Sequence, residues 1–73
     1  MEKFVIGKNI QRWRSFRGKK QKPFAKEIGV SRVMLSRYEN GRSEISLTHL
    51  EVIAKTLGIT IVDLLNENID KLQ

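Results

Sequence analysis

Several kinds of chemistry are absent from this sequence. It contains no cysteine, a single proline and no apolar run near the roughly 20 residues that span a membrane. Disulfides and thiolate metal sites are therefore excluded. It also has no Walker loop, no dinucleotide-binding glycine pattern and no nucleophile elbow, so we expect neither an enzyme nor a bound cofactor. Its first residues lack the apolar core of a signal peptide, and we expect a soluble, cytoplasmic protein.

The charge is unevenly distributed along the chain. Residues 8–42 contain eleven Lys and Arg against two acidic residues, a net charge of +9, whereas the remaining residues carry a net charge of −3. A merely solvated surface would scatter its charges, so this concentration indicates a polyanionic partner. Nucleic acid fits better than a membrane surface, because no long amphipathic segment places Trp or Phe opposite a basic face.

The length and the apolar periodicity predict one all-α domain. We assign residues 1–73 to it, with a core at 6–65 and a helical extension or tail at 66–73. Apolar residues recur at helical rather than alternating spacing. The five expected helices cover 5–17, 21–28, 32–39, 47–57 and a segment that begins after Thr60. Their expected inward residues are Ile6, Ile10, Trp13 and the stem of Arg17, then Phe24, Ala25, Ile28, Leu35 and Tyr38, then Leu47, Leu50, Ile53, Ala54 and Leu57. The last segment is expected to continue through Leu64 and Leu65.

Capping residues mark the ends of these helices. Ser31 and Ser46 are the expected N-caps, because a hydroxyl there accepts a hydrogen bond from a free backbone N–H. Thr60 and Asp63 have the spacing of a capping box. The expected C-terminal signals are Asn40-Gly41 and Gly58.

A three-residue break, Gly29-Val30-Ser31, separates the second and third expected helices. Two helices joined this tightly form a helix-turn-helix. The motif needs a small residue where its helices cross, which Ala25 supplies, and a positive φ in the turn, which Gly29 adopts at no steric cost. A helical hairpin used only for packing is the alternative.

The third expected helix has an outward face suited to contacting bases. At about 100° per residue, Leu35 and Tyr38 define its inward side. The outward positions are then Arg32, Val33, Ser36 and Arg37. Arg binds guanine O6 and N7 with two hydrogen bonds, Ser donates or accepts, and Val contacts a thymine methyl. An ordinary solvated face explains Val33 poorly, so we expect these four residues to contact bases.

Two motifs carry a family resemblance. Residues 21–31 are QKPFAKEIGVS and residues 35–42 are LSRYENGR. Further matching positions are Ile6-Gly7, Ile10 and Arg14 upstream and IAKTLGIT at 53–60 downstream. Together they resemble the lambda-repressor-like, Cro/Xre-type helix-turn-helix family of transcriptional regulators. The resemblance implies a five-helix domain that binds double-stranded DNA with its helices 2 and 3.

The resemblance also implies roles for single positions. Gln21 matches a family glutamine that binds a DNA phosphate and supports the recognition helix. Asn40 and Arg42 match positions that contact the DNA backbone just after that helix. The outward residues of the third helix lie at or between the positions at which family members contact bases. Arg14 and Glu39 match a family ion pair, and a carboxylate at the negative end of a helix dipole independently needs a nearby cation.

Three positions depart from the family pattern. Lys19 stands where an apolar residue is usual, and Lys20 stands where a small capping residue is usual. Pro23 lies in the first turn of the second helix, where its missing N–H costs little. The start of that helix is therefore expected to be weak, and Lys20 is expected to contact phosphate instead.

The remaining expectations concern partners. Because one helix-turn-helix covers only a few base pairs, we expect a homodimer. Ile61, Leu65, Ile69 and Leu72 would form an apolar stripe for pairing if the last helix continues to the end. His49, the single histidine, is expected at the surface or in packing rather than as a metal ligand. Two alternatives stay open: an antitoxin or other protein-binding module that also binds its own promoter, and an RNA-binding adaptor.

Overall fold

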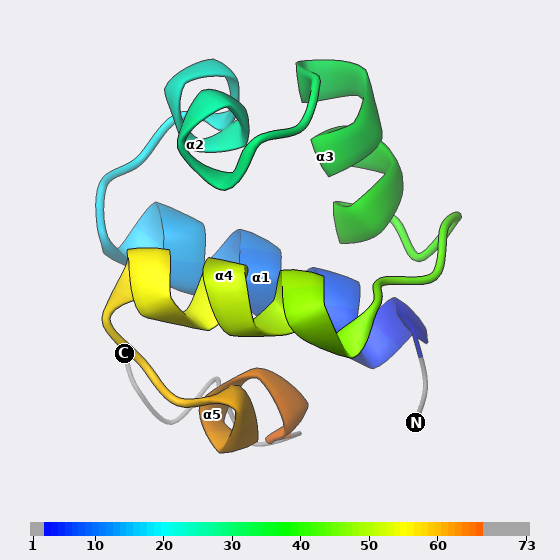
Figure 1. The fold of residues 1–73 in the computed structure, drawn as a ribbon, viewed down its shortest axis with the longest axis vertical. Coiled ribbons are helices and arrows are strands. Elements are labelled where there is room, and N and C mark those ends of the chain that lie inside the picture. Colours follow the sequence, from blue (N-terminus) through cyan, green and yellow to red (C-terminus); the bar gives the residue numbers. More distant parts are fainter. Residues whose placement is uncertain (1–2, 67–73) are drawn as a thin grey trace.

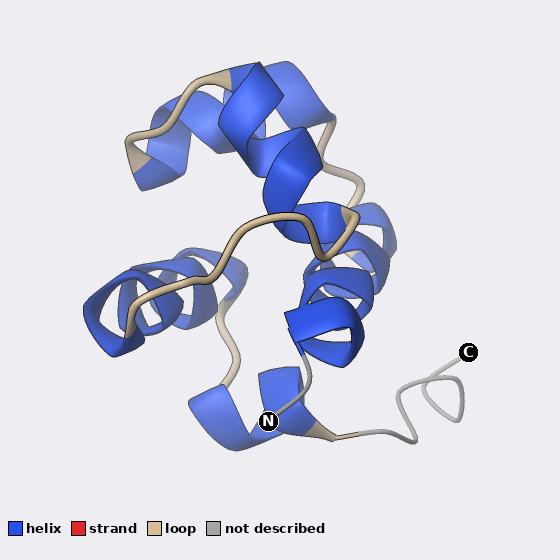
Figure 2. Ribbon diagram, turned by 90° about the vertical axis from the view of Figure 1, so that its right-hand side faces the viewer, coloured by secondary structure: helices blue, strands red, loops and turns tan. Residues whose placement is uncertain are grey.

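The computed structural model describes residues 3–66, which form five helices and no strands. The helices are α1 (Lys3–Phe16), α2 (Gln21–Ile28), α3 (Arg32–Glu39), α4 (Leu47–Leu57) and α5 (Ile61–Leu65). In Figure 1, α1 and α4 form a middle layer, with α2 and α3 on one side of it and α5 on the other. Figure 2 shows the same three layers from a second direction. The predicted all-α, five-helix fold is confirmed.

A single apolar core joins the three layers. Each helix contributes one side chain with no exposed surface, and these are Ile10, Phe24, Leu35, Ile53 and Leu64. Fully burying one such side chain contributes about 1.5–3 kcal/mol. Since every helix supplies one of them, no helix can leave the domain without opening the core.

The helix ends follow the local capping chemistry of the sequence. Ser31 Oγ accepts from Met34 N at 3.0 Å, and Ser46 Oγ accepts from His49 N at 3.1 Å. Thr60 and Asp63 form the expected capping box. The backbone turns between α2 and α3 at Gly29, whose φ is 81°. The bounds predicted for α2, α3 and α4 are confirmed.

Two residues expected to face inward do not. Leu47 was expected in the core, but 65% of it is exposed. It is the first residue of α4, and because helical side chains lean toward the N-terminus, Leu47 projects past the end of the helix. Arg17 was expected within the first helix, which ends instead at Phe16. The Arg17 guanidinium lies 5.3 Å from the centre of the Trp13 ring, on the outside of the core.

The last helix ends at Leu65, and of the helical extension or tail predicted for residues 66–73 only Asn66 lies within the described residues. Asn66 has extended backbone, with φ −76° and ψ 121°. Asn9, buried in α1, explains this end, because its Nδ2 donates to Leu64 O at 2.7 Å and to Asn66 O at 2.8 Å. The predicted positions of Ile69 and Leu72 on an apolar stripe lie outside the described residues.

Helix α1 crosses α3 very closely at Gly7. A Cβ atom at this position would overlap the backbone carbonyl oxygen of Tyr38 and crowd Glu39. Glycine is therefore required by the packing of two backbones, although it lies inside a helix, where it is intrinsically unfavourable.

We expect Gly7→Ala to lower the free energy of unfolding by about 1–3 kcal/mol or more, because a methyl group must be forced between two backbones. In an exposed helix the same change raises the free energy of unfolding by about 1 kcal/mol. At Gly7 we expect a decrease instead. Urea denaturation measures the difference. Ser15→Ala, on the exposed side of α1, is the matched control and should change stability by less than about 0.5 kcal/mol. A Gly7→Ala variant as stable as the control would contradict the close crossing.

Candidate nucleic-acid interface

Helix α3 turns the residues predicted to contact bases toward solvent. Arg32, Val33 and Arg37 are exposed, and Ser36 is partly exposed. Val33 is 66% exposed even though it is apolar. The opposite side of the helix is buried in the core, as expected from the position of Leu35 and Tyr38. The helix therefore offers one complete side to a partner.

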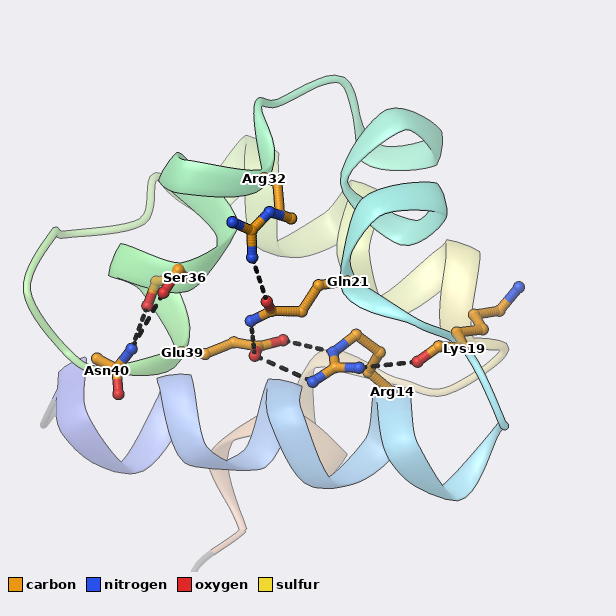
Figure 3. A network of polar contacts seen from close by, with 7 residues as sticks. All are labelled: Arg14, Lys19, Gln21, Arg32, Ser36, Glu39 and Asn40. Atoms are coloured by element: carbon orange, nitrogen blue, oxygen red, sulfur yellow. Dashed lines mark hydrogen bonds and ion pairs between the residues drawn. The ribbon is translucent and has the colours of Figure 1, made fainter.

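The predicted pair of Arg14 and Glu39 is present as a buried, bidentate ion pair (Figure 3). Arg14 Nε donates to Glu39 Oε2 at 2.7 Å, and Nη2 donates to Oε1 at 3.2 Å. The side chains are 10% and 1% exposed. Arg14 Nη1 donates in addition to Lys19 O at 2.8 Å. One guanidinium thus fixes the end of α3 and the loop before α2 against α1.

Gln21 connects this buried pair to the start of α3. Its Nε2 donates to Glu39 Oε1 at 2.9 Å, and its Oε1 accepts from Arg32 Nη1 at 3.4 Å. Figure 3 shows the amide lying between the carboxylate and the arginine. The amide nitrogen faces an acceptor and the amide oxygen faces a donor. The buried Glu39 carboxylate therefore orients Arg32 through Gln21.

Arg37 is held at the other end of α3. Its Nε donates to Ser43 Oγ at 2.8 Å, and its Nη2 donates to Arg42 O at 3.2 Å. A guanidinium carries five N–H donors, so Nη1 and the second hydrogen of Nη2 are left over by these two bonds. In arginines that recognise guanine, donors in this position make the two hydrogen bonds to the base.

The residues predicted to bind phosphate flank α3 at both ends. Gln21 lies beside its first residue, and Lys20 precedes Gln21. Asn40 and Arg42 follow its last residue, and Asn40 Nδ2 donates to Ser36 O at 2.8 Å. Lys20 is the N-cap of α2 but makes no capping hydrogen bond with its side chain, as expected from its departure from the family pattern. The Lys20 side chain therefore caps neither Gln21 N nor Lys22 N, the two N–H groups that precede Pro23, and N–H groups at the start of a helix are donors of the kind that bind anions.

Some hydrogen-bonding groups of the domain were missed by sequence reasoning. Ser43 holds Arg37, and Asn9 holds the end of α5, but neither lies in a motif. The only advance signal for Asn9 was a polar side chain beside the apolar stripe of the first helix. His49 was expected at the surface or in packing, and it is partly buried with both ring nitrogens hydrogen-bonded.

The described residues offer neither a metal site nor a membrane span. Within residues 3–66, no three His, Asp or Glu side chains come together in a way that could bind a metal ion. No helix in that range has both the length and the apolar character needed to cross a bilayer.

Comparison with known proteins identifies relatives. A family model described as helix-turn-helix matches residues 10–64. The antitoxin PezA of Streptococcus pneumoniae is 39% identical over 64 residues, which are 88% of this chain. The match covers only 40% of PezA, so this chain spans less than half the length of that relative.

Solved structures of transcription regulators share this fold. The clp gene regulator ClgR of Corynebacterium glutamicum superposes with a TM-score of 0.88 at 27% identity, over 97% of this chain and 76% of that chain. SinR, a master regulator of biofilm formation crystallised in complex with DNA, superposes with a TM-score of 0.75 at 29% identity. That match covers 84% of this chain and 98% of SinR.

We expect Glu39→Gln to lower the free energy of unfolding by about 3–5 kcal/mol, because it leaves the Arg14 guanidinium buried without a counter-charge. Glutamine keeps the shape of the side chain, so the loss reports the charge. Chemical denaturation followed by circular dichroism measures it.

Glu27→Gln is the matched control, since it breaks the Lys19–Glu27 pair, in which the Glu27 side chain is 46% exposed. That exposed pair should contribute less than about 1 kcal/mol. Equal losses in the two variants would mean that the Arg14–Glu39 pair orients nothing in the fold.

Proposed function

This chain belongs to the helix-turn-helix family, and on that premise we propose that it is a transcription regulator that binds a specific site in double-stranded DNA. The observation that carries the proposal is the solvent-facing side of α3, with two oriented arginines, a hydroxyl and an exposed valine. A major groove admits a helix of this size and displays hydrogen-bonding groups that distinguish all four base pairs. The net charge of +9 in residues 8–42 supplies attraction to the DNA backbone.

The four outward residues divide the task of base recognition. Arg37 binds guanine with the free end of its fork, while Ser43 and the Arg42 carbonyl hold the other edge of the guanidinium. Arg32 contacts a second base from the start of the helix. Ser36 donates or accepts between them, and Val33 packs on a thymine methyl.

The residues around α3 set its position on the DNA. Lys20, Gln21 and the free N–H groups at the start of α2 bind one phosphate region, and Asn40 and Arg42 bind another. Contacts of this kind fix the register of a protein on the duplex and carry no sequence information themselves. Gln21 has a double role, because it also contacts Glu39 and Arg32.

Two copies of the domain bind one site in this proposal. A single helix-turn-helix contacts too few base pairs to select one site in a genome, and dimers place two recognition helices about one DNA turn apart. Repression is the proposed outcome, because a dimer that occupies a promoter excludes other proteins without any catalytic step.

A second candidate function is that of an antitoxin that also binds its own promoter. The observation in its favour is the 39% identity to PezA, which is named an antitoxin. Purification of the chain from its native host separates the two functions. A stoichiometric protein partner that the chain inactivates supports the antitoxin, and isolation of the chain with its DNA site alone supports the regulator.

Selection from a library of random duplexes tests the proposal directly. We expect enrichment of a two-fold symmetric site whose half-sites lie about 10–10.5 base pairs apart, because two α3 helices enter successive major grooves. Sedimentation of the protein with the selected duplex gives the number of copies bound. A library that shows no enriched sequence after repeated rounds would refute specific recognition.

Arg37 and Arg42 are expected to differ in what they contribute. Arg37→Lys keeps the charge but loses the fork, so it should cost about 1–3 kcal/mol on the selected site and relax the preference for one guanine. Arg42→Ala should weaken binding to selected and random duplexes alike and reduce the salt slope by about one. Titrations at several salt concentrations measure both effects. The division into base and phosphate contacts is wrong if the two variants give the same sequence profile.

A further inference from the structure

His49 lies on α4, outside the helix-turn-helix, yet it is hydrogen-bonded to both helices of that motif. Its Nδ1 is 2.9 Å from the Tyr38 hydroxyl on α3. Its Nε2 is 3.0 Å from the backbone oxygen of Ile28, the last residue of α2. The rings of His49 and Tyr38 meet edge to face, with centroids 5.5 Å apart and an interplanar angle of 87°.

The chemistry of the partners fixes the hydrogens on the imidazole ring. A carbonyl oxygen only accepts, so Nε2 must carry the hydrogen that is donated to Ile28 O. In the neutral ring Nδ1 then has a free lone pair and accepts from the Tyr38 hydroxyl. The carbonyl at the end of α2 is one of those that a helix leaves without an internal partner, and His49 provides one.

These two bonds span the turn of the motif. Ile28 lies on one side of the Gly29 turn and Tyr38 lies in the last turn of α3, so His49 ties the two helices to the same point on α4. Apolar contacts between α2 and α3 allow small rotations, since they have little directional preference. Hydrogen bonds weaken steeply when they are bent, so they restrict that rotation.

We infer that His49 is a positioning residue for DNA recognition, which fixes the angle between α2 and α3 and therefore the direction in which Arg32 and Arg37 point. For its effect on binding, this inference rests on the proposed function. The orientation of the two helices is independent of DNA and is measured separately.

Three variants separate the two bonds. His49→Phe keeps an aromatic ring and loses both bonds, Tyr38→Phe removes only the hydroxyl, and His49→Gln restores a donor toward Ile28 O. Thr56→Val is the control, because it removes a hydrogen bond of α4, from Thr56 Oγ1 to Val52 O at 2.8 Å, that touches neither α2 nor α3. The double variant of Tyr38→Phe and His49→Phe completes a mutant cycle.

Three measurements on the whole chain follow. Nitrogen-15 NMR of the imidazole ring should show a hydrogen on Nε2, the ring nitrogen that faces Ile28 O. Residual dipolar couplings of the backbone amides give the orientation of α2 relative to α3, which should change in His49→Phe and not in Thr56→Val. At a temperature where all variants are folded, His49→Phe should bind the selected duplex about tenfold more weakly, as expected for two lost hydrogen bonds, with random duplex unaffected.

The other variants sharpen the expected result. His49→Gln should recover part of the loss, and Tyr38→Phe should add nothing to His49→Phe, because the hydroxyl acts through the imidazole. If His49→Phe does not fold, the comparison of Tyr38→Phe with the parent decides by the same two measurements.

The inference would be overturned if His49→Phe melted at a lower temperature but kept the dipolar couplings of the parent and its preference for the selected duplex. If the parent chain itself fails to distinguish selected from random duplex, the proposed function fails. The dipolar couplings still show in that case whether His49 holds the two helices.

Discussion

The carboxylate of Glu39 is buried at the end of α3, where it accepts hydrogen bonds from α1 and α2 at once. A buried carboxylate is tolerated only when its oxygens are paired, and here Arg14 contacts both oxygens while Gln21 adds a third bond. Turning α3 by one residue would carry Glu39 about 100° away and leave Arg14 buried without a counter-charge. The buried charge pair therefore reinforces the orientation of α3 that the burial of Leu35 and Tyr38 already favours.

Apolar burial and polar contacts consequently contribute in different ways. The fully buried apolar side chains, one from each helix, hold the domain together, whereas the polar contacts direct particular groups. A hydrogen bond to Gln21 orients Arg32, and a hydrogen bond to Ser43 orients Arg37. Immobilising a long side chain on binding costs about 0.5–1.5 kcal/mol, so arginines already held in the free protein lose less freedom when they meet a partner.

The sequence was sufficient for features that depend on neighbours along the chain. The starts of α3, α4 and α5 were predicted because each cap acts over three residues, and the outward side of α3 followed from the helical angle alone. Leu47 was placed wrongly, because periodicity does not show whether anything covers the first turn of a helix. Ser43 and His49 were missed as partners because their contacts depend on how a loop and a third helix pack in space.

The hydrogen bonds of Asn9 have a consequence for the way the domain is made. Its partner Leu64 O lies 55 residues later in the sequence, so Asn9 is synthesised before that partner exists. The five residues of α5 are too few to form a stable helix alone, since isolated helices shorter than about 12–15 residues are marginal in water. Docking of α5 and burial of the Asn9 amide must therefore occur together. Helix α1 precedes the other four described helices in the chain, yet it is among the last to reach its final surroundings.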